Sequence, residues 1–303
     1  MKILFVADLF VEDGINGGGE LNNEELIKIL LERGHEVYKA HSSRLDVNAM
    51  PPKEYKIILG NFLGLEFKVA KEIINNYSFF IISNFINLSM PSRSILKNLN
   101  YLIYEHDHKY LKTRDPSPFK NFKAPQNMLV NQDLYKNAKA ILCQSKLHKE
   151  VIEKNLLLSN IINLSGNLWS EETLKHVEDI ATSQEEKSDK CSIMYSNFPN
   201  KNVEGSIKYC KIKELEYDKI MPCGHQEFLD KLNKNKSLVF FPKTLETLSR
   251  IVIEARMMNC RVITNKMIGA TSEEWFKLKG KDLIKEMRNR RESIPNKVLE
   301  IFE

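Results

Sequence analysis

The chain has few of the features that mark secreted, zinc-binding or membrane-spanning proteins. Its five cysteines are scattered and never form a C-x-x-C pair, lying at Cys143, Cys191, Cys210, Cys223 and Cys260. This pattern excludes a disulfide framework and a zinc site, and it predicts reduced, mostly structural thiols in a cytoplasmic protein. No apolar run approaches the roughly 20 residues that cross a bilayer. The apolar start Met1–Ala7 is too short for a signal peptide, so a first strand is expected there.

Charge of one sign is also scarce. The formal net charge is +5 over 303 residues, of which 42% are hydrophobic and 28% charged, as is normal for a soluble globular protein. The length is sufficient for two domains of ordinary size. A small positive charge suits an anionic small ligand, an anionic membrane surface or nucleic acid, and it does not decide among them. The sequence has no internal repeat and no low-complexity tract.

The first half of the chain alternates apolar runs with amphipathic segments. The strand Lys2–Ala7 is followed by Gly17–Gly19, by a helix predicted from about residue 21 to 32, and by a strand from His35. Strand, helix and strand form a βαβ unit, which requires a parallel sheet. The glycines let a ligand approach the backbone at the helix start, although their spacing is not G-x-G-x-x-G. Further strands are predicted over 56–60, 79–83, 101–104, 140–145 and 160–164, with helices over 64–76, 88–99, 127–137 and 146–154, which makes a doubly wound domain.

Four polar residues, Glu105, His106, Asp107 and His108, follow the predicted strand 101–104. Ligands of open parallel sheets bind at the carboxyl ends of the strands. This group could hold a metal, transfer protons, or form a polar loop with one ordered histidine. The spacing is crowded for a metal and no distant ligands match it, so no metal site is predicted. The basic loop 109–118 after it either shapes the same ligand site or is solvated.

The second half repeats the alternation after a charged segment. Residues 182–190 lack large apolar side chains and are the best candidate linker, after a helix over 169–181. Strands are predicted at 192–195, 220–222, 236–241 and 261–264, with helices over 203–210 and 226–232, from about 246 to 258, and over 282–302 with a break possible at Pro295. The predicted division is 1–168 for the first domain, 169–280 for the second, and 281–303 for a helical tail that crosses back.

Two carboxylates frame the helix predicted after the strand that ends at Phe241. Glu246 and Glu254 are eight residues apart, which on a helix is about 12 Å with an angular offset of about 80°. They therefore do not grip one atom together. They are placed to hold two ends of one elongated ligand, with the helix N-terminus facing an anion between them. Two solvated glutamates on an ordinary amphipathic helix are the alternative.

This stretch resembles a signature of known enzymes. Pro242, Glu246, Glu254-Ala255 and Val262–Thr264 are similar to the C-terminal signature of the retaining nucleotide-sugar glycosyltransferases of family 4, with Leu248-Ser249 in place of the usual Phe-Gly. Gly17–Glu20 resembles the glycine loop of that family and Arg33–Val37 its R-G-H-E-V segment. Lys201-Asn202 resembles the second half of its G-R-x-x-x-x-K motif, whereas the arginine of that motif is replaced by Ser196-Asn197.

The resemblance implies an α/β protein of GT-B fold, with two Rossmann-like domains facing each other across a cleft. It implies a nucleotide-diphosphate-sugar donor, most often a UDP- or GDP-sugar, no cofactor and no tightly bound metal. A catalytic role is implied for His106, Lys201 and Glu246. The implied donor-binding residues are Gly17, Gly18, Gly19, Lys201, Glu246, Thr247, Leu248, Ser249, Arg250 and Glu254, and the acceptor-side residues are Glu20, His106, Asp107 and His108.

Three functions remain open at this stage. The first is a hexosyltransferase that transfers sugar with retention to a hydroxyl of a glycan, a lipid-linked or a small-molecule acceptor, in the cytoplasm or in peripheral contact with an anionic membrane. The second is a degenerate GT-B protein that binds a nucleotide or glycan without catalysis, which the missing arginine and a short second domain favour. The third is a glycosyltransferase acting on nucleic acid, for which the mild charge gives little support. The sequence does not specify an oligomeric state.

Overall fold

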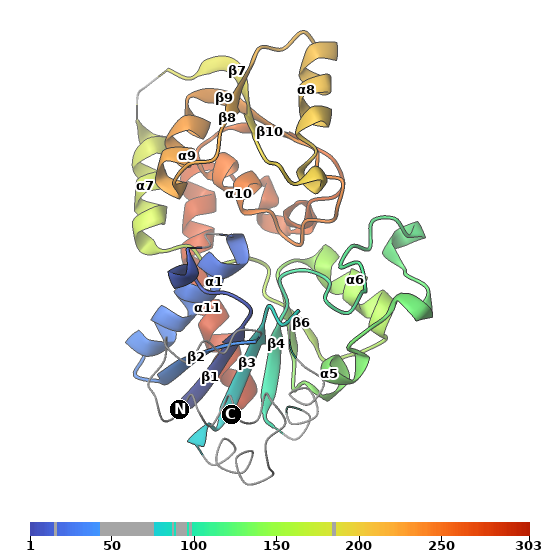
Figure 1. Cartoon of the computed structure of the whole chain (residues 1–303). Helices are drawn as coiled ribbons and strands as arrows, with labels where there is room; N and C mark the ends of the chain where they lie inside the picture. The colour runs from blue at the N-terminus through green and yellow to red at the C-terminus, as the bar shows by residue number, and fades with distance from the viewer. Residues whose placement is uncertain (15–16, 43–75, 87, 89–95, 97–98, 184–185) are drawn as a thin grey trace.

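The structure is a computed structural model that describes residues 1–14, 17–42, 76–86, 88, 96, 99–183 and 186–303. The chain forms two lobes, each built on a parallel sheet (Figure 1). The predicted strand 56–60 and the predicted helices 64–76 and 88–99 lie wholly or mostly outside the described residues. Within the described part, none of the helices has the length and apolar character needed to cross a membrane.

The first lobe contains a sheet of six parallel strands in the order β2-β1-β3-β4-β5-β6. Its central strands are apolar runs that are buried on both faces, as expected of a parallel sheet covered by helices. The strands are β1 (Lys2–Ala7), β2 (Glu36–His41), β3 (Phe79–Ser83), β4 (Tyr101–Tyr104), β5 (Ile141–Cys143) and β6 (Ile161–Asn163). The helices are α1 (Gly18–Glu32), α5 (Gln132–Asn137) and α6 (Lys146–Leu156).

The second lobe contains a sheet of four parallel strands in the order β10-β9-β7-β8. Its strands are β7 (Ser188–Met194), β8 (Tyr217–Ile220), β9 (Asn235–Phe240) and β10 (Arg261–Thr264). Its helices are α7 (Glu171–Thr182), α8 (Val203–Ile212), α9 (His225–Asn233) and α10 (Arg250–Met257). Strand β7 therefore begins inside the predicted linker, and β8 overlaps the predicted strand 220–222 only at Ile220. Short 3₁₀ turns are η1 (Val11–Asp13), η2 (Lys120–Phe122), η3 (Gln126–Met128), η4 (Pro199–Lys201), η5 (Gly269–Ser272) and η6 (Glu274–Lys277).

The last helix, α11 (Gly280–Phe302), connects the two lobes (Figure 1). It is one helix with Pro295 inside it rather than two helices with a break. Its first half packs Leu283, Ile284 and Met287 into the core of the second lobe. Its second half packs Ile294, Val298 and Phe302 into the core of the first lobe, beside β1 and α1. Helix α11 thus packs against the cores of both lobes.

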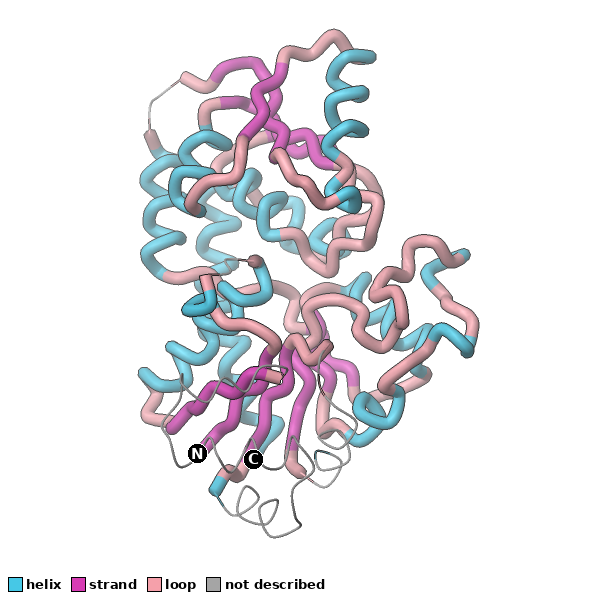
Figure 2. The backbone as a smooth tube through the Cα atoms, viewed as in Figure 1, coloured by secondary structure: helices cyan, strands magenta, loops and turns pink. Residues whose placement is uncertain are grey.

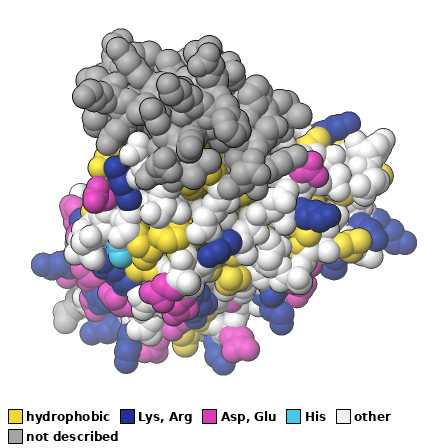
Figure 3. All heavy atoms as spheres, turned by 90° about the horizontal axis from the view of Figure 1, so that it is seen from below, with side chains coloured by type: hydrophobic (Ala, Val, Ile, Leu, Met, Phe, Trp, Pro, Cys, Tyr) yellow, Lys and Arg dark blue, Asp and Glu magenta, His cyan; other side chains and the backbone are white. Residues whose placement is uncertain are grey.

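The surface at the outer end of the first lobe carries charges of both signs. In the view of Figure 3, Lys and Arg side chains are interspersed with Asp and Glu over the described surface. The mixture matches the small net charge of +5. Interspersed charges on a surface favour solubility without creating a large field of one sign.

Candidate functional site

The loops that follow β4 and β9 meet at the boundary between the lobes (Figure 2). A cavity of about 480 Å³ lies at this boundary, and residues of both lobes line it. We call it the interlobe cavity. Its wall includes His106 and every residue predicted to bind the donor, namely Gly17, Gly18, Gly19, Lys201, Glu246, Thr247, Leu248, Ser249, Arg250 and Glu254. Residues as far apart in the sequence as Gly17 and Glu254 thus line one cavity.

Glu254 is a buried carboxylate on α10 that lines this cavity. Its Oε1 accepts a hydrogen bond from Trp169 Nε1 at 2.9 Å and lies 3.0 Å from His225 Nε2. Burial by itself would raise the pKa of Glu254, but His225, Arg250 and the Trp169 indole outweigh burial and lower the pKa to about 2. These contacts all use Oε1. The group is therefore an oriented anion that can accept hydrogen bonds from the hydroxyls of a ligand.

Arg250 lies between Glu254 and the glycine loop. Its guanidinium carbon lies 4.4 Å from the centre of the Trp169 ring, and its Nη1 donates to the carbonyl oxygen of Leu168 at 2.5 Å. Its Nε is 3.7 Å from Glu254 Oε1. A Cβ at Gly18 would lie 3.0 Å from the Arg250 Cδ, so glycine leaves room for this side chain. The arrangement fixes one cation at the wall of the cavity.

A second cation comes from the turn that follows β7. Lys201, at the end of η4, places its Nζ 2.8 Å from Glu246 Oε1. Both side chains line the interlobe cavity. The pair is only partly buried, so each group remains accessible to a ligand. Lys201 and Arg250 together supply two cations to one wall.

The residues before Arg250 do not form the start of a helix, which corrects the prediction that the helix begins near Glu246. Glu246 is extended and pairs with Ile268 in a parallel bridge, and its N–H donates to the Met267 carbonyl at 2.9 Å. Ser249 has a φ of +78° and precedes α10. The calculated helical separation of the two glutamates therefore does not apply, because only Glu254 is on the helix.

His106 is held by hydrogen bonds at both ring nitrogens. Its Nε2 lies 2.8 Å from Asn23 Oδ1, and its Nδ1 lies 2.8 Å from Gln144 Nε2. The ring also packs against Tyr104 with the ring centres 4.6 Å apart. Burial, with a smaller effect of Lys109, lowers the pKa of His106 to about 3. The imidazole is thus neutral, donates from Nε2, accepts at Nδ1, and has a fixed orientation.

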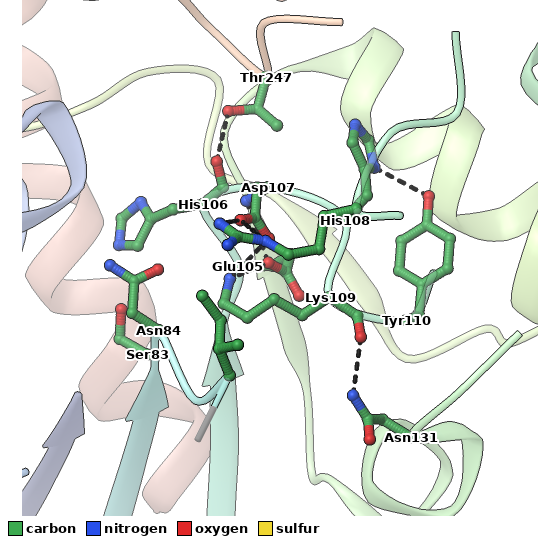
Figure 4. A network of polar contacts seen from close by, with 12 residues as sticks. Ser83, Asn84, Glu105, His106, Asp107, His108, Lys109, Tyr110, Asn131 and Thr247 are labelled. Carbon is green, nitrogen blue, oxygen red and sulfur yellow. Dashed lines mark hydrogen bonds and ion pairs between the residues drawn. The ribbon is translucent and has the colours of Figure 1, made fainter. Parts of the chain in front are cut away.

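The residues on either side of His106 form a buried ionic network (Figure 4). Lys109 Nζ bonds the buried carboxylate of Glu105 and lies 2.9 Å from Asp107 Oδ1. Asp107 is also paired with Arg114, whose Nε lies 2.8 Å from Oδ2, and Tyr135 donates to Glu105. Burial by itself would raise the pKa of Asp107, but Lys109 and Arg114 hold it well below its usual range. The network fixes the loop that carries His106 and Asp107.

Two of the residues predicted on the acceptor side lie elsewhere. The His108 ring is buried against His148 and Tyr110, with Nδ1 2.9 Å from the Tyr110 hydroxyl, and it lines neither the interlobe cavity nor the one beside Asp107. Glu20 lines neither cavity, and its Oε1 accepts from Asn84 Nδ2 at 3.0 Å. In contrast, Asp107 lines a cavity together with His106. The chain bends at His106 and Asp107, so that the His106 side chain lines the cavity whereas the His108 side chain packs in the core.

Direct hydrogen bonds join the lobes beside the cavity. Ser145 Oγ donates to the Thr247 carbonyl at 2.6 Å, and Thr247 Oγ1 lies 2.9 Å from the His106 carbonyl. The N–H of Lys146, in the first turn of α6, donates to Glu273 Oε1 at 2.5 Å. A carboxylate from the second lobe thus bonds the N-terminus of a helix in the first lobe, where the helix dipole favours a negative charge.

Three side chains of the site were not predicted from the sequence. Trp169 and His225 both bond Glu254, and Gln144 lies 2.8 Å from His106 Nδ1 and 2.7 Å from Thr247 Oγ1. Trp169 follows the first domain directly, and His225 begins α9. Of the three, only Gln144 could have been predicted from the sequence, because it directly follows a buried strand at the sheet edge where ligands bind.

Comparisons with known proteins bear on the fold. No protein-family model and no curated protein matches the chain. The sucrose-phosphate synthase from Thermosynechococcus elongatus matches with a TM-score of 0.58 at 11% identity, covering 99% of this chain and 98% of that one. The catalytic domain of starch synthase IV from Arabidopsis thaliana, bound to ADP and acarbose, matches with a TM-score of 0.53 at 9% identity, covering 99% and 98%.

AviGT4, a glycosyltransferase involved in avilamycin A biosynthesis, matches with a TM-score of 0.50 at 12% identity, covering 99% of this chain and 96% of that one. Identities this low show the fold and not the reaction. The fold is GT-B, with two parallel-sheet lobes facing each other, which confirms the predicted fold class.

Proposed function

We propose that this protein is a retaining glycosyltransferase that moves a hexose from a nucleotide-diphosphate sugar to a hydroxyl acceptor. The observation that carries the proposal is the interlobe cavity, in which a glycine loop, two cations and two carboxylates meet on a GT-B fold. We assign residues 1–168 to the acceptor-side domain, 169–280 to the donor domain and 281–303 to the connecting tail. The protein acts in the cytoplasm or in peripheral contact with an anionic membrane.

The donor occupies the interlobe cavity with its nucleoside near α10. Glu254, oriented by Trp169 and His225, accepts hydrogen bonds from the ribose hydroxyls. The diphosphate lies between Lys201 and Arg250, and the backbone of the glycine loop approaches it from the first lobe. Arg250 thereby provides the positive charge that the arginine absent from Ser196-Asn197 supplies in the family that the sequence resembles. A UDP- or GDP-sugar is the expected donor, and no metal or cofactor is required.

Catalysis depends on stabilising the diphosphate as it leaves. Lys201 and Arg250 oppose the negative charge that develops on the leaving oxygen, and such preorganised groups contribute most of the stabilisation of a charged transition state. Glu246 accepts hydrogen bonds from the sugar and is itself oriented by Lys201. We propose the front-face displacement that the resemblance implies, in which the acceptor oxygen bonds the anomeric carbon on the side from which diphosphate departs. The acceptor proton passes to the departing phosphate oxygen.

The geometry changes the role that we assign to His106. A general base needs a free nitrogen and a pKa near the working pH, whereas both nitrogens of His106 are bonded to amides and its pKa is about 3. We therefore propose that His106 positions the reacting sugar between the two lobes through its neutral, fixed ring. Its carbonyl oxygen bonds Thr247, which joins the acceptor side to the donor side.

Binding without catalysis is the second candidate, and the absent arginine favours it. The measured quantity that separates the two is release of nucleoside diphosphate from a donor sugar. A thermal-shift panel of UDP, GDP, ADP and CMP with their sugar derivatives identifies the donor, and ADP belongs in the panel because the starch synthase neighbour is bound to it. We expect one nucleotide to raise the melting temperature of the wild type.

Glu254→Ala is the matching variant, and it is expected to weaken binding of that nucleotide by tenfold to a hundredfold, because hydrogen bonds to a charged group contribute about 1.5–3 kcal/mol. Glu216→Ala is the control, since Glu216 is exposed at the edge of the second sheet. Donor binding without slow hydrolysis or transfer would support the binding protein. If no nucleotide raises the melting temperature of the wild type, the proposed function is wrong.

A further inference from the structure

A second cavity of about 460 Å³ adjoins the interlobe cavity. Residues of both lobes line it, and it shares His106, Glu246 and Thr247 with its neighbour. We call it the Phe198 cavity, after the aromatic residue on its wall. Its volume lies in the range of small-molecule sites, which is about 300–1,000 Å³. A molecule in it would meet the ligand of the interlobe cavity at the three shared residues.

The wall of the Phe198 cavity is polar and carries more acids than bases. The carboxyl groups are those of Asp107, Asp115 and Glu246, whereas Arg114 is its one basic residue among the described residues that line it. That guanidinium is already paired with Asp107. Asp107 and Glu246 are also paired, with Lys109 and Lys201. A phosphate in this cavity would therefore meet no free cation among the described residues that line it. The remaining polar groups are hydroxyls and amides, which suit neutral hydroxyl groups.

Phe198 gives this polar cavity one exposed aromatic face. Its side chain is 72% exposed, and it immediately precedes the turn η4 that carries Lys201. The loop is held in place, since the Phe198 N–H donates to Ser196 Oγ at 3.2 Å and the Lys243 N–H donates to the Asn200 carbonyl at 2.8 Å. An aromatic ring held at the edge of a polar site offers a flat, electron-rich face to the C–H face of a sugar ring.

The opposite wall is also fixed. Arg114 has a φ of +56°, a conformation that is uncommon for residues other than glycine, and its side chain is anchored on Asp107. Ser117 Oγ accepts from the N–H of Leu245 in the second lobe at 2.8 Å, and Asp115 accepts from the Ser117 N–H at 2.9 Å. The loop 113–117 is thus tied across the lobe boundary and encloses the cavity beside Glu246.

We propose that the Phe198 cavity binds the acceptor, and that the acceptor is a neutral, polyhydroxylated sugar ring. The inference rests on the proposed glycosyl transfer and specifies its acceptor class. The ring stacks on Phe198 and donates hydroxyl hydrogen bonds to Asp107 and Asp115. One further hydroxyl faces the donor sugar at His106, Glu246 and Thr247. The described wall has no free cation to bind a lipid phosphate or the backbone of DNA, and its polar side chains do not favour binding of an aliphatic chain.

The test uses the full chain loaded with the nucleotide found in the thermal-shift panel. The probes are p-nitrophenyl α- and β-glycosides of glucose, galactose and mannose, with a short-chain polyprenyl phosphate and duplex DNA as competing classes. Binding is measured by saturation-transfer NMR, and transfer is measured by mass spectrometry with the matching donor sugar. We expect at least one glycoside to bind and to be glycosylated.

Two variants and one control locate the acceptor. Phe198→Ala and Asp115→Asn are expected to raise the KM for the glycoside at least tenfold, with no comparable change in the Kd for the nucleotide. Ile212→Ala is the control, because Ile212 is also an exposed apolar residue, at the end of α8. It is expected to change neither value.

The outcomes separate this inference from the proposed function. Donor hydrolysis without transfer to any glycoside overturns the acceptor class and leaves the proposed transferase standing. Transfer to the polyprenyl phosphate or to DNA alone also overturns it. An unchanged glycoside KM in Phe198→Ala moves the acceptor out of this cavity. If no nucleotide binds, the proposed function fails first, and the inference fails with it.

Discussion

Arg250 is the residue to which we assign the positive charge beside the diphosphate, and the residues next to it in the sequence do not indicate this role. Arg250 lies on the first turn of α10. The position of its guanidinium group is fixed by contacts with Trp169, Leu168 and Glu254. Burial lowers the pKa of Arg250 from its usual value, and Glu254 opposes that effect. Arginine remains charged in proteins. The cost of burying this cation is offset by the stacking and ion-pair contacts.

Arg250→Lys tests whether this cation acts on the diphosphate. Lysine keeps the charge but loses the planar group that stacks on Trp169 and bonds Leu168, so the charge is no longer fixed. We expect kcat to fall about 10²-fold, as when one preorganised donor is lost from a charged transition state. The Kd for the nucleotide should change less than kcat. Chemical denaturation of the variant checks that the fold is intact, and an unchanged kcat would assign Arg250 a purely structural role.

Buried histidines near the loop of β4 predict how stability depends on pH. His148 is buried, with Nε2 2.9 Å from the Asp107 carbonyl and Nδ1 3.3 Å from the Gln144 N–H, and burial lowers its pKa to about 4. His106 and His108 are also shifted downward by burial. Below a pH of about 6.5 these histidines are protonated in the unfolded chain but stay neutral in the folded chain. The free energy of unfolding should therefore fall from pH 6.5 towards pH 4.

His148→Gln should flatten this dependence. The amide keeps a donor for the Asp107 carbonyl but does not titrate, so between pH 6.5 and pH 5 the variant should lose about 2 kcal/mol less than the wild type. Urea denaturation at pH 7, 6 and 5 measures the slope. Glu254 does not interfere, because a carboxyl with a pKa lowered to about 2 loses its stabilising charge only below pH 4.5. Equal slopes in both proteins would mean that His148 does not carry the effect.

Sequence patterns identify candidate residues for this site but not the directions of their side chains. Motif spacing and the carboxyl ends of strands identify Glu254, Lys201 and the glycines as candidates, and these residues line one cavity. His106 and His108 were indistinguishable, because they are two residues apart and strand alternation would place both on one face. The bend of the chain after β4 is what separates their side chains. Trp169 and His225 reach Glu254 through tertiary packing that no local pattern contains.

At the scale of elements, the segment 246–249 shows where local pattern and tertiary structure disagree. The apolar spacing continues back from α10 to Glu246, which favours a helix. Instead, Glu246 pairs with Ile268, and the Gly269 N–H donates to the Glu246 carbonyl at 2.8 Å. Backbone pairing between two loops outweighs helix propensity, which is a weak preference. Helix ends are accordingly less predictable than helix existence, and here the difference sets the position of Thr247.

Gly269 lies in close contact with the segment that carries Thr247 and with Ser145 of the first lobe. A Cβ at this position would lie 2.0 Å from the Thr247 carbonyl oxygen and 2.5 Å from Ser145 Oγ. Gly269→Ala should therefore separate the loops and weaken the bond between the lobes, with a loss of about 1–3 kcal/mol in the free energy of unfolding, as in other overpacked sites. Gly224→Ala is the control, because a Cβ there meets no atom within 4 Å. Similar stabilities for the two variants in urea would contradict this account.

At the scale of the whole molecule, one helix serves both cores. Helix α11 buries Met287 in the second lobe and Ile294 in the first, both without exposed surface. The lobes are further joined by Glu273, which bonds the Lys146 N–H and lies 3.0 Å from Asn163 Nδ2. Since the proposed donor and acceptor sites lie between the lobes, their geometry depends on this connection. The amphipathic pattern of the last helix was visible in the sequence, whereas its two separate partners were not.

A shared helix implies that the two lobes unfold together. Met287→Ala and Ile294→Ala each remove a buried side chain and should cost about 2–5 kcal/mol. If α11 couples the lobes, either substitution lowers the midpoint of one common urea transition, whether it is followed by the fluorescence of Trp169 and Trp275 or by far-ultraviolet circular dichroism. Glu300→Ala, on the exposed face of the same helix, should leave the midpoint unchanged. Two separate transitions, with Met287→Ala affecting one and Ile294→Ala the other, would show that the lobes are independent folding units and that α11 only tethers them.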